Sequence, residues 1–295
     1  MRGQVYIDGA IVELAEGRLP VTDRGFLYGD SVYEALRTFG GRPFALEDHL
    51  DRLERSAAGL ALPLPPREVI REATRATITA LLAGGDPDGY VRIVVTRGSG
   101  PLGIDPGLAE GPRLIVFALP LRLPPTELYE RGARVVIVGR RRGLFGGPGA
   151  VEPQVKSGNY LNAVLAVAEA KRRGADEAIF CDALGRVVEG STSNLFIVKG
   201  RRLLTPPPSL GLLEGITRRY LIACARSLGH PVDEVALWPV DLEHADEIFL
   251  TSSVRGLLAV VEVDGQRIGD GRPGPLGRHL AERYLAEATR LAAAD

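Results

Sequence analysis

Apolar runs of strand length and amphipathic runs of helix length alternate irregularly along this chain, and that order limits its fold more than any other feature. The segment QVYIDGAIVEL, within residues 3–14, predicts a hairpin turned at Asp8-Gly9. Further strands are expected at 90–97, 113–119, 177–181, 186–189 and 194–199, and in RVVIVG, EIFLT and GLLAVVEV. Helices are expected at about 47–60, 66–83, 159–173, 215–229 and 275–292. Because strands and helices mix without a strict βαβ order, we expect an α+β fold, mixed in its connections, with barrel-like sheets.

The length of 295 residues suggests about two domains. The proline-bearing stretch PLRLPPTELYERG is the best candidate for a connection between them. The predicted division is therefore a small N-terminal α/β domain over 1–120, an interdomain linker over 121–132 and a larger C-terminal domain over 133–295.

Composition and charge exclude several classes of function. A formal net charge of −1 gives no basic excess for binding nucleic acid or a membrane surface. The N-terminus lacks the apolar region of a signal peptide, and no run of about 18 apolar residues could span a bilayer. Cys181, Cys224 and four scattered His lack the spacing of a metal site. We therefore expect a cytoplasmic protein without a metal centre.

Lysine is rare in this chain. Of its 36 lysines and arginines only three are lysines, at positions 156, 171 and 199. Lys156 precedes a strongly apolar helix, where a lysine can point into a cleft, although most lysines are solvated surface residues. Unlike arginine, an amine can lose its proton and attack a carbonyl carbon. Desolvation would lower the pKa of this amine and make Lys156 a Schiff-base nucleophile.

Glu189 ends a predicted strand and precedes a turn of small residues, in GRVVEGSTSNLF. A glutamate in such a place is usually a surface residue. If Lys156 binds an aldehyde cofactor with a pyridine ring, however, an ionised carboxylate is needed to keep the ring nitrogen protonated. Glu189 is the candidate for that role.

Three segments could bind a phosphate. Gly215, Ile216 and Thr217 begin a helix, so their amide hydrogens are free to bind an anion, although Thr217 could simply cap the helix. The run Thr251-Ser252-Ser253 follows a strand and could be a donor-rich turn or an ordinary loop. Arg52 could supply a guanidinium to the same phosphate, or lie on a solvated helix face.

Together, the motifs KSGNYL, EGSTSNLF and GITR resemble the class IV aminotransferases, pyridoxal 5′-phosphate enzymes of fold type IV. The resemblance extends from about Tyr6 to Val263, and the family includes branched-chain aminotransferases, D-amino-acid aminotransferases and aminodeoxychorismate lyases. It implies a two-domain architecture and a homodimer or higher even oligomer, in which a small-domain loop of one subunit covers the site of its neighbour. It also implies that Lys156 binds the cofactor aldehyde, Glu189 pairs with the pyridine nitrogen and Tyr160 donates to the ring hydroxyl oxygen. The phosphate would be held by Arg52, Ile216, Thr217 and Ser253, with Ser252 beside them.

The substrate is less clearly indicated. The segments FLYGDSVYEALRTFGG and YVRIVVTRGSGPLGIDP resemble the branched-chain type at Tyr28, Tyr33, Arg37, Tyr90 and Arg92. Aromatic rings would surround an apolar side chain, and an arginine would allow glutamate to bind in the same pocket. After the strand at 246–250, Val254 and Arg255 are bulkier than usual for that type, and the loop at 143–149 is rich in glycine. Arg255 could bind a substrate carboxylate or lie on the surface.

The predicted activity is a ping-pong transamination between an amino acid, with a branched-chain L-amino acid or glutamate favoured, and a 2-oxo acid. Three alternatives stay open: a D-amino-acid aminotransferase, a lyase of the aminodeoxychorismate type and a non-catalytic protein that binds pyridoxal phosphate.

Overall fold

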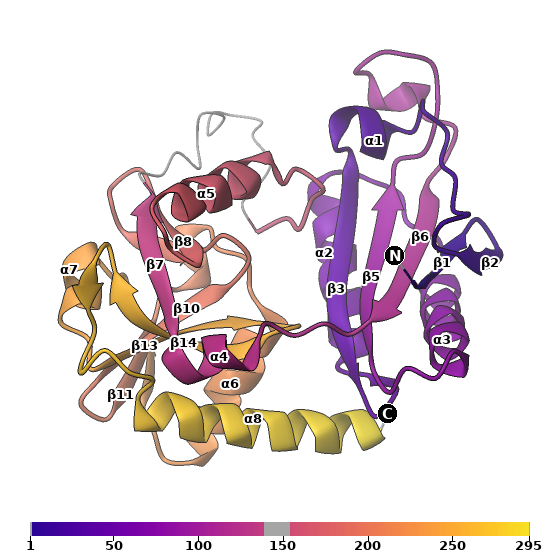
Figure 1. The fold of residues 1–295 in the computed structure, drawn as a ribbon. Helices are drawn as coiled ribbons and strands as arrows, with labels where there is room; N and C mark the ends of the chain where they lie inside the picture. The colour runs from indigo at the N-terminus through magenta and orange to yellow at the C-terminus, as the bar shows by residue number, and fades with distance from the viewer. Residues whose placement is uncertain (1, 139–153, 295) are drawn as a thin grey trace. The chain divides into compact units, whose positions relative to one another are not determined.

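The computed structural model describes residues 2–138 and 154–294, and the glycine-rich loop at 143–149 lies outside them (Figure 1). The chain forms two compact units. Unit 1 consists of Met1–Arg122, Val155–Asn159 and Ala288–Asp295, and unit 2 of Leu123–Gln154 and Tyr160–Glu287. The short segment that carries Lys156 thus belongs to unit 1. The linker expected at 121–132 stays a prediction, and α4 (Thr126–Arg131) forms a short helix within it.

Unit 1 is built on an antiparallel sheet. Among the described residues, six strands follow the order β2-β1-β6-β5-β3-β4, and each neighbouring pair is antiparallel. The strands are β1 (Gln4–Ile7), β2 (Ala10–Glu13), β3 (Ser31–Phe39), β4 (Arg42–Pro43), β5 (Gly89–Thr96) and β6 (Arg113–Pro120). The helices are α1 (Arg24–Tyr28), α2 (Leu46–Gly59), α3 (Arg67–Ala83) and the 3-10 turn η1 (Pro106–Leu108).

The hairpin expected at the N-terminus is confirmed. Val5 pairs with Val12 and Ile7 with Ala10 across β1 and β2. Asp8 has φ 47° and Gly9 has φ 96°, so both turn residues are in the left-handed region that a tight two-residue hairpin turn requires. Asp and Gly are among the residues that tolerate this conformation best.

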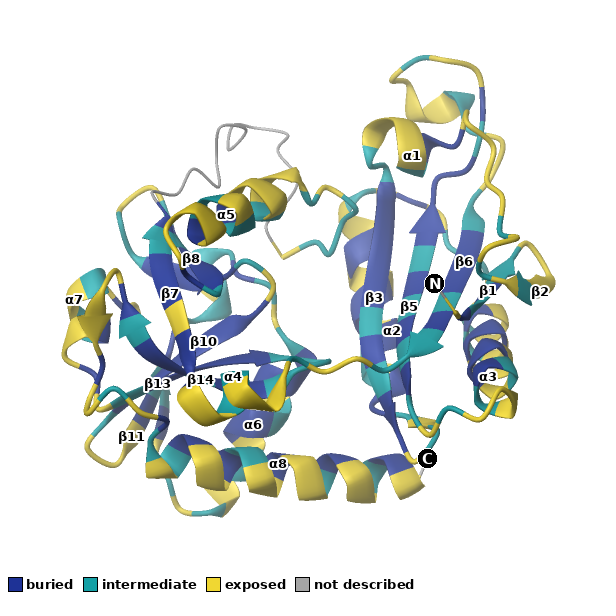
Figure 2. Cartoon of the chain, in the orientation of Figure 1, coloured by how far each residue is buried: buried dark blue, intermediate teal, exposed yellow. Residues whose placement is uncertain are grey.

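The core of unit 1 lies between the sheet and two helices. Helix α2 packs on β3, and α3 packs on β1, β5 and β6. Leu36, Leu50, Leu53 and Ile93 belong to a cluster of fully buried side chains. In Figure 2 most of β3 has the dark blue of buried residues. Most residues of β3 are buried on both faces of the sheet, which explains why its sequence shows no alternation of apolar and polar residues.

Unit 2 contains a larger, mixed sheet. Within the described ranges its order is β12-β11-β10-β13-β14-β7-β8-β9, with β15 added beside β14. The pairs β11/β12, β14/β7 and β7/β8 are parallel, and the other pairs are antiparallel. The strands are β7 (Ala133–Val138), β8 (Glu177–Cys181), β9 (Val187–Gly190), β10 (Asn194–Lys199), β11 (Arg202–Thr205), β12 (Val232–Glu234), β13 (Glu247–Ser252), β14 (Gly256–Val263) and β15 (Gln266–Arg267). The sheet curls into a half-barrel, so the expected α+β fold with a barrel-like sheet is confirmed (Figure 1).

The helices of unit 2 cover this sheet. They are α5 (Leu161–Arg172), α6 (Ile216–Ser227), α7 (Pro239–Glu243) and the part of α8 (Pro275–Ala294) up to Glu287, together with α4 and the 3-10 turn η2 (Pro208–Leu210). Helix α5 packs on β7 and β8, and α6 packs on β12 and β13. Every helix in the part of the chain that the structure describes is too short or too polar to cross a membrane.

Helix α5 turns only part of its apolar surface toward its own unit. Ala166 and Ala170 are buried against the sheet. Leu161, Val164 and Leu165 are 70%, 57% and 61% exposed. The predicted helix is therefore confirmed, but most of the apolar stripe that identified it is exposed in the single chain, and Figure 2 colours much of α5 as exposed.

Candidate functional site

The backbone around Lys156 is fixed against β3 and α2 within unit 1. The amide of Lys156 donates to Ser56 Oγ at 3.1 Å, and its carbonyl accepts from the amide of Tyr33 at 3.0 Å. The amide of Gly158 donates to the carbonyl of Ser31 at 2.9 Å. The segment that carries Lys156 therefore extends the sheet beside the start of β3, and its position does not depend on the side chain.

The side chains of Lys156, Tyr33 and Arg92 come together. Lys156 Nζ lies 4.4 Å from the centroid of the Tyr33 ring, and Arg92 Cζ lies 4.2 Å from the same centroid. Tyr33 is only 5% exposed, whereas Lys156 and Arg92 are half-buried. Both cations can interact with the electron-rich face of the ring. The amine predicted to react thus lies against an aromatic side chain that also contacts a guanidinium.

A buried carboxylate on β3 holds Arg52. Glu34 Oε1 accepts from Arg52 Nε at 2.8 Å, and Oε2 accepts from Arg52 Nη2 at 2.6 Å and from His49 Nδ1 at 2.7 Å. All three residues are buried, so Arg52 does not lie on a solvated helix face. Glu34 and His49 are absent from the predicted site, because neither belongs to a recognised motif. The only signal in the sequence is an acidic residue inside the otherwise apolar stretch VYEAL.

The network of Glu34, His49 and Arg52 has a defined charge state. Burial alone would raise the pKa of Glu34, but the charges and hydrogen bonds of Arg52 and His49 hold it well below its usual range. Burial lowers the pKa of His49, so its imidazole is neutral near pH 7. A carboxylate can only accept, so Nδ1 carries the proton and Nε2 is a buried acceptor for which the described residues provide no donor.

The other predicted substrate residues of unit 1 are placed as follows. Arg37 and Tyr90 are cross-strand partners on β3 and β5, and Arg37 Cζ lies 4.3 Å from the ring centroid of Phe39. Tyr28 ends α1, is partly exposed and accepts from the amide of Gly103 at 3.2 Å. Tyr28 is thus attached to the loop before η1, while Arg37 and Tyr90 are neighbours in the sheet.

In unit 2, Glu189 is buried in β9 and is connected to the loop before α6. Its Oε2 accepts from the amide of Leu213 at 3.1 Å, and Asn194 Nδ2 donates to the carbonyl of Leu213 at 2.8 Å. A Cβ on Gly215 would lie 2.0 Å from Asn194 Oδ1, so only glycine fits there. Glu189 is therefore not a surface residue, and the start of α6 is held close to it.

The first turn of α6 is available to an anion. Its N-cap is Gly215, which has no side chain to bind the free amides, and Ile216 is buried. Thr217 does not cap the helix, contrary to the simpler alternative, because the N-cap is Gly215 and no side chain makes a capping hydrogen bond. Its hydroxyl lies 3.3 Å from the hydroxyl of Tyr284. Helix α6 packs on β13, where Thr251 Oγ1 is buried without a hydrogen-bond partner among the described residues. Free amides and a buried, unpaired hydroxyl suit a phosphate.

The turn after β13 contains the remaining predicted residues. Ser252, Ser253 and Val254 are half-buried. Arg255 Nη1 donates to Glu177 Oε2 at 2.5 Å, and Arg255 Nε donates to Ser252 Oγ at 3.3 Å. Arg255 therefore has a buried ion-pair partner and is not a surface residue. Glu177 is absent from the predicted site, because nothing distinguishes it from other acidic residues at the start of a strand.

The predicted residues fall into two groups. The structure places Tyr28, Tyr33, Arg37, Arg52, Tyr90, Arg92 and Lys156 in unit 1. It places Tyr160, the N-cap residue of α5, in unit 2 together with Glu189, Ile216, Thr217, Ser252, Ser253, Val254 and Arg255. Their combined action in one site stays a prediction.

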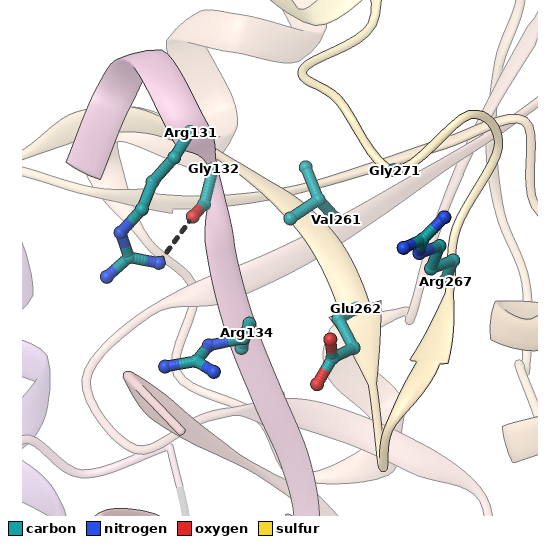
Figure 3. A pocket seen from close by; sticks show the side chains of 7 residues that line it. All are labelled: Arg131, Gly132, Arg134, Val261, Glu262, Arg267 and Gly271. Carbon is teal, nitrogen blue, oxygen red and sulfur yellow. Dashed lines mark hydrogen bonds between the residues drawn. The ribbon is translucent and has the colours of Figure 1, made fainter. Parts of the chain in front are cut away.

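A cavity of about 370 Å³ lies elsewhere on unit 2, and Figure 3 shows the side chains that line it. Glu262 on β14 is the register partner of Arg134 on β7 and of Arg267 on β15. Arg131 donates to the carbonyl of Gly132 at 2.8 Å. Alternating charges across adjacent strands are typical of a solvated sheet surface, and none of the predicted site residues lines this cavity. Residues 2–138 and 154–294 contain no group of three or more His, Cys, Asp or Glu that could hold a metal ion.

Comparisons with known proteins agree with the motifs. The sequence model of the family described as Amino-transferase class IV matches residues 31–263. A Methanocaldococcus jannaschii protein, provisionally named a branched-chain-amino-acid aminotransferase, is 38% identical over 281 residues, which cover 95% of each chain. The D-alanine aminotransferase of Bacillus licheniformis is 30% identical over 277 residues, 94% of each chain. The structure of the T.th. branched-chain amino acid aminotransferase complexed with N-(5′-phosphopyridoxyl)-L-glutamate aligns with a TM-score of 0.88 at 31% identity, and covers 99% of this chain and 95% of that one.

Proposed function

This chain belongs to the class IV aminotransferase family, and on that premise we propose that it is a pyridoxal 5′-phosphate-dependent transaminase of branched-chain L-amino acids and glutamate. The observation that carries the proposal is the cluster of Lys156, Tyr33 and Arg92 in unit 1. It combines a nucleophilic amine, an aromatic wall and a guanidinium, which a transaminase of these substrates needs.

The residues present fit the cofactor. The free amides at the start of α6, together with the hydroxyls of Thr217, Ser252 and Ser253, form a donor set for a phosphate. Arg52, whose guanidinium binds Glu34 in unit 1, stays a phosphate ligand predicted from the motifs. The buried carboxylate of Glu189 would pair with the pyridine nitrogen, and Tyr160 would donate to the ring hydroxyl oxygen.

Pyridoxal phosphate, when bound, supplies an aldehyde that accepts an amino group and a ring that withdraws electrons. Lys156 would bind the aldehyde carbon and, once displaced by an amino acid, would remove the proton from the substrate's Cα. The hydrogen bonds of its backbone to Ser56 and Tyr33 hold the main chain still while the side chain moves. The Glu189 carboxylate would favour the protonated form of the pyridine nitrogen.

Tyr33 and Arg92 would determine the substrate. The Tyr33 ring offers an apolar surface to a branched aliphatic side chain, and Arg92 offers hydrogen bonds to the second carboxylate of glutamate. Arg37 and Tyr90, paired across β3 and β5, would line the same pocket. One pocket could then accept both the donor and the acceptor in turn. The M. jannaschii relative and the T.th. structure, which contains a derivative of L-glutamate, are consistent with these substrates.

A D-amino-acid aminotransferase is the second candidate, because the B. licheniformis relative is a D-alanine aminotransferase of nearly full-length similarity. Handedness depends on where the pocket binds the α-carboxylate, and the motifs shared by the family do not determine that position. A lyase of the aminodeoxychorismate type and a non-catalytic protein that binds the cofactor are the other outcomes to test.

We also propose a homodimer in the cytoplasm. The exposed stripe of α5, formed by Leu161, Val164 and Leu165, is more apolar than a solvated helix face should be. In unit 1, Phe26, Leu102 and Ile104 are exposed as well, at 72%, 75% and 88%. A second copy of the chain would cover these side chains. Neither Cys181 nor Cys224 forms a disulfide, which suits a reducing compartment.

The test uses the purified protein loaded with pyridoxal phosphate, mixed separately with L-leucine, L-glutamate, D-alanine and D-glutamate. We expect the absorption of the aldehyde form to change to that of the aminated cofactor with the two L-amino acids. Lys156→Ala should abolish this change and Lys171→Ala should not. A response to the D-amino acids alone would support the second candidate, and no response to any of the four would support the lyase or the non-catalytic protein.

A further inference from the structure

We propose that Glu177 and Arg255 are a positioning pair that fixes two turns of unit 2 relative to each other. One turn, residues 190–193, follows Glu189, and the other, residues 252–255, contains Ser252 and Ser253. The inference rests on the proposed function, in which Glu189 contacts the cofactor ring and the two serines contact its phosphate. It assigns to Arg255 a role different from the binding of a substrate carboxylate.

Glu177 holds the first turn. Its Oε1 accepts from Ser193 Oγ at 2.7 Å and from Ser191 Oγ at 3.3 Å. A Cβ on Gly190 would lie 2.2 Å from Ser193 Oγ and 2.8 Å from Glu177 Oε1, so glycine at this position allows the carboxylate and the turn to meet. Glu177 is only 3% exposed, so these hydrogen bonds form away from water.

Arg255 connects the same carboxylate to the second turn. Its Nη1 donates to Glu177 Oε2 at 2.5 Å and its Nε donates to Ser252 Oγ at 3.3 Å. The carbonyl of Arg255 accepts from the hydroxyl of Tyr129 at 2.9 Å, which anchors the backbone of the turn. One carboxylate, with one oxygen directed to each turn, thus joins the two segments.

The third guanidinium nitrogen, Arg255 Nη2, is buried and has no hydrogen-bond partner among the described residues. The other two nitrogens, Nη1 and Nε, are engaged with Glu177 and Ser252. Arg255 therefore acts through Glu177 and Ser252. Because the site must hold a ring and a phosphate at a fixed separation, a carboxylate that bridges their two binding turns contributes to affinity through preorganisation.

The test compares the affinities of the apoprotein for pyridoxal 5′-phosphate and for pyridoxal, which has the same ring and aldehyde but no phosphate. In Arg255→Met the second turn loses its link, so affinity for pyridoxal phosphate should fall by about 10- to 100-fold, while that for pyridoxal changes by less than about threefold. Arg255→Lys should recover part of the difference because it keeps the charge. Glu177→Gln, which can still accept from Ser193, should resemble Arg255→Met.

Arg131→Met is the matched control, since Arg131 pairs with Asp176, the residue before Glu177, at 2.7 Å but contacts neither turn. It should leave the ratio of the two affinities unchanged. Circular dichroism of each apoprotein checks that it is folded. If Arg255→Met is not folded, Arg255→Lys replaces it in the comparison of affinities. An unchanged ratio in folded Arg255 and Glu177 variants would overturn the positioning role. A wild-type protein that binds neither compound would instead overturn the proposed function.

Discussion

The buried network of Glu34, His49 and Arg52 gives a quantitative prediction for Glu34→Gln. Glu34 is fully buried and accepts three hydrogen bonds of 2.6–2.8 Å, two of them from the Arg52 guanidinium. The amide of glutamine keeps one acceptor oxygen but presents an NH₂ group to one donor and leaves the guanidinium charge without compensation. Removing one partner of a buried pair costs about 3–5 kcal/mol. At about 2–4 °C for each kcal/mol, the melting temperature should fall by roughly 10 °C.

The effect of Glu34→Gln should also depend on pH. The folded-state pKa of Glu34 lies below that of the unfolded chain, so its stabilisation is present above the ordinary value of 4.5 and is lost as the pH falls further, through the folded-state pKa. The difference in unfolding free energy between wild type and Glu34→Gln should be constant near neutral pH. It should shrink below about pH 4.5.

The assay is urea unfolding followed by circular dichroism, with Glu47→Gln as the control. Glu47 also binds two arginines, Arg67 and Arg71, but its side chain is 50% exposed. Hydrogen bonds from Arg71 and Arg67 lower the pKa of Glu47 to about 2, yet solvent screening should limit its loss to about 1 kcal/mol or less. The reasoning would be refuted if Glu34→Gln lost no more unfolding free energy than Glu47→Gln. It would also be refuted if the loss in Glu34→Gln were the same in acid as at neutral pH.

Three further predictions concern unit 2. Gly190→Ala should lower the unfolding free energy by about 1–3 kcal/mol, because the added Cβ displaces Ser193 Oγ from Glu177. Unfolding in urea measures the loss, and an unchanged midpoint would contradict the contact. Leu165→Asp should sediment as a monomer of 31.6 kDa. Leu184→Asp, at a similarly exposed leucine outside α5, should stay dimeric. If both variants are dimers, the stripe is not the interface. Glu189→Ala should retain pyridoxal phosphate in absorbance titrations but lose at least about 100-fold in turnover, and near-normal turnover would remove the carboxylate from its role.

The sequence predicts elements whose signals are local. The turn at Asp8-Gly9 and the helix over 47–60 depend on residues within a few positions of each other, and both are present. The family expected from the motifs is also confirmed. Strand β3 is missing from the predicted strands, because burial on both faces removes the alternation that identifies a strand.

Other features depend on contacts between distant positions. The Glu34 carboxylate can be buried because His49 and Arg52 on α2 bind it, and these residues lie 15 and 18 positions further along the chain. Glu177 forms its ion pair with Arg255, which lies 78 residues further along the chain. No local pattern contains such pairs. The apolar stripe of α5 shows another limit: periodicity locates the helix, but it does not indicate whether Leu165 is covered by its own chain or by another copy.

The central claim is that the amine of Lys156 forms the covalent bond to pyridoxal phosphate. Borohydride reduction of the loaded protein, followed by digestion and mass spectrometry, tests it directly, and a chain with only three lysines makes the assignment simple. We predict a single pyridoxyl group on the peptide that contains Lys156. A pyridoxyl group on Lys171 or Lys199, or none at all, would contradict the claim.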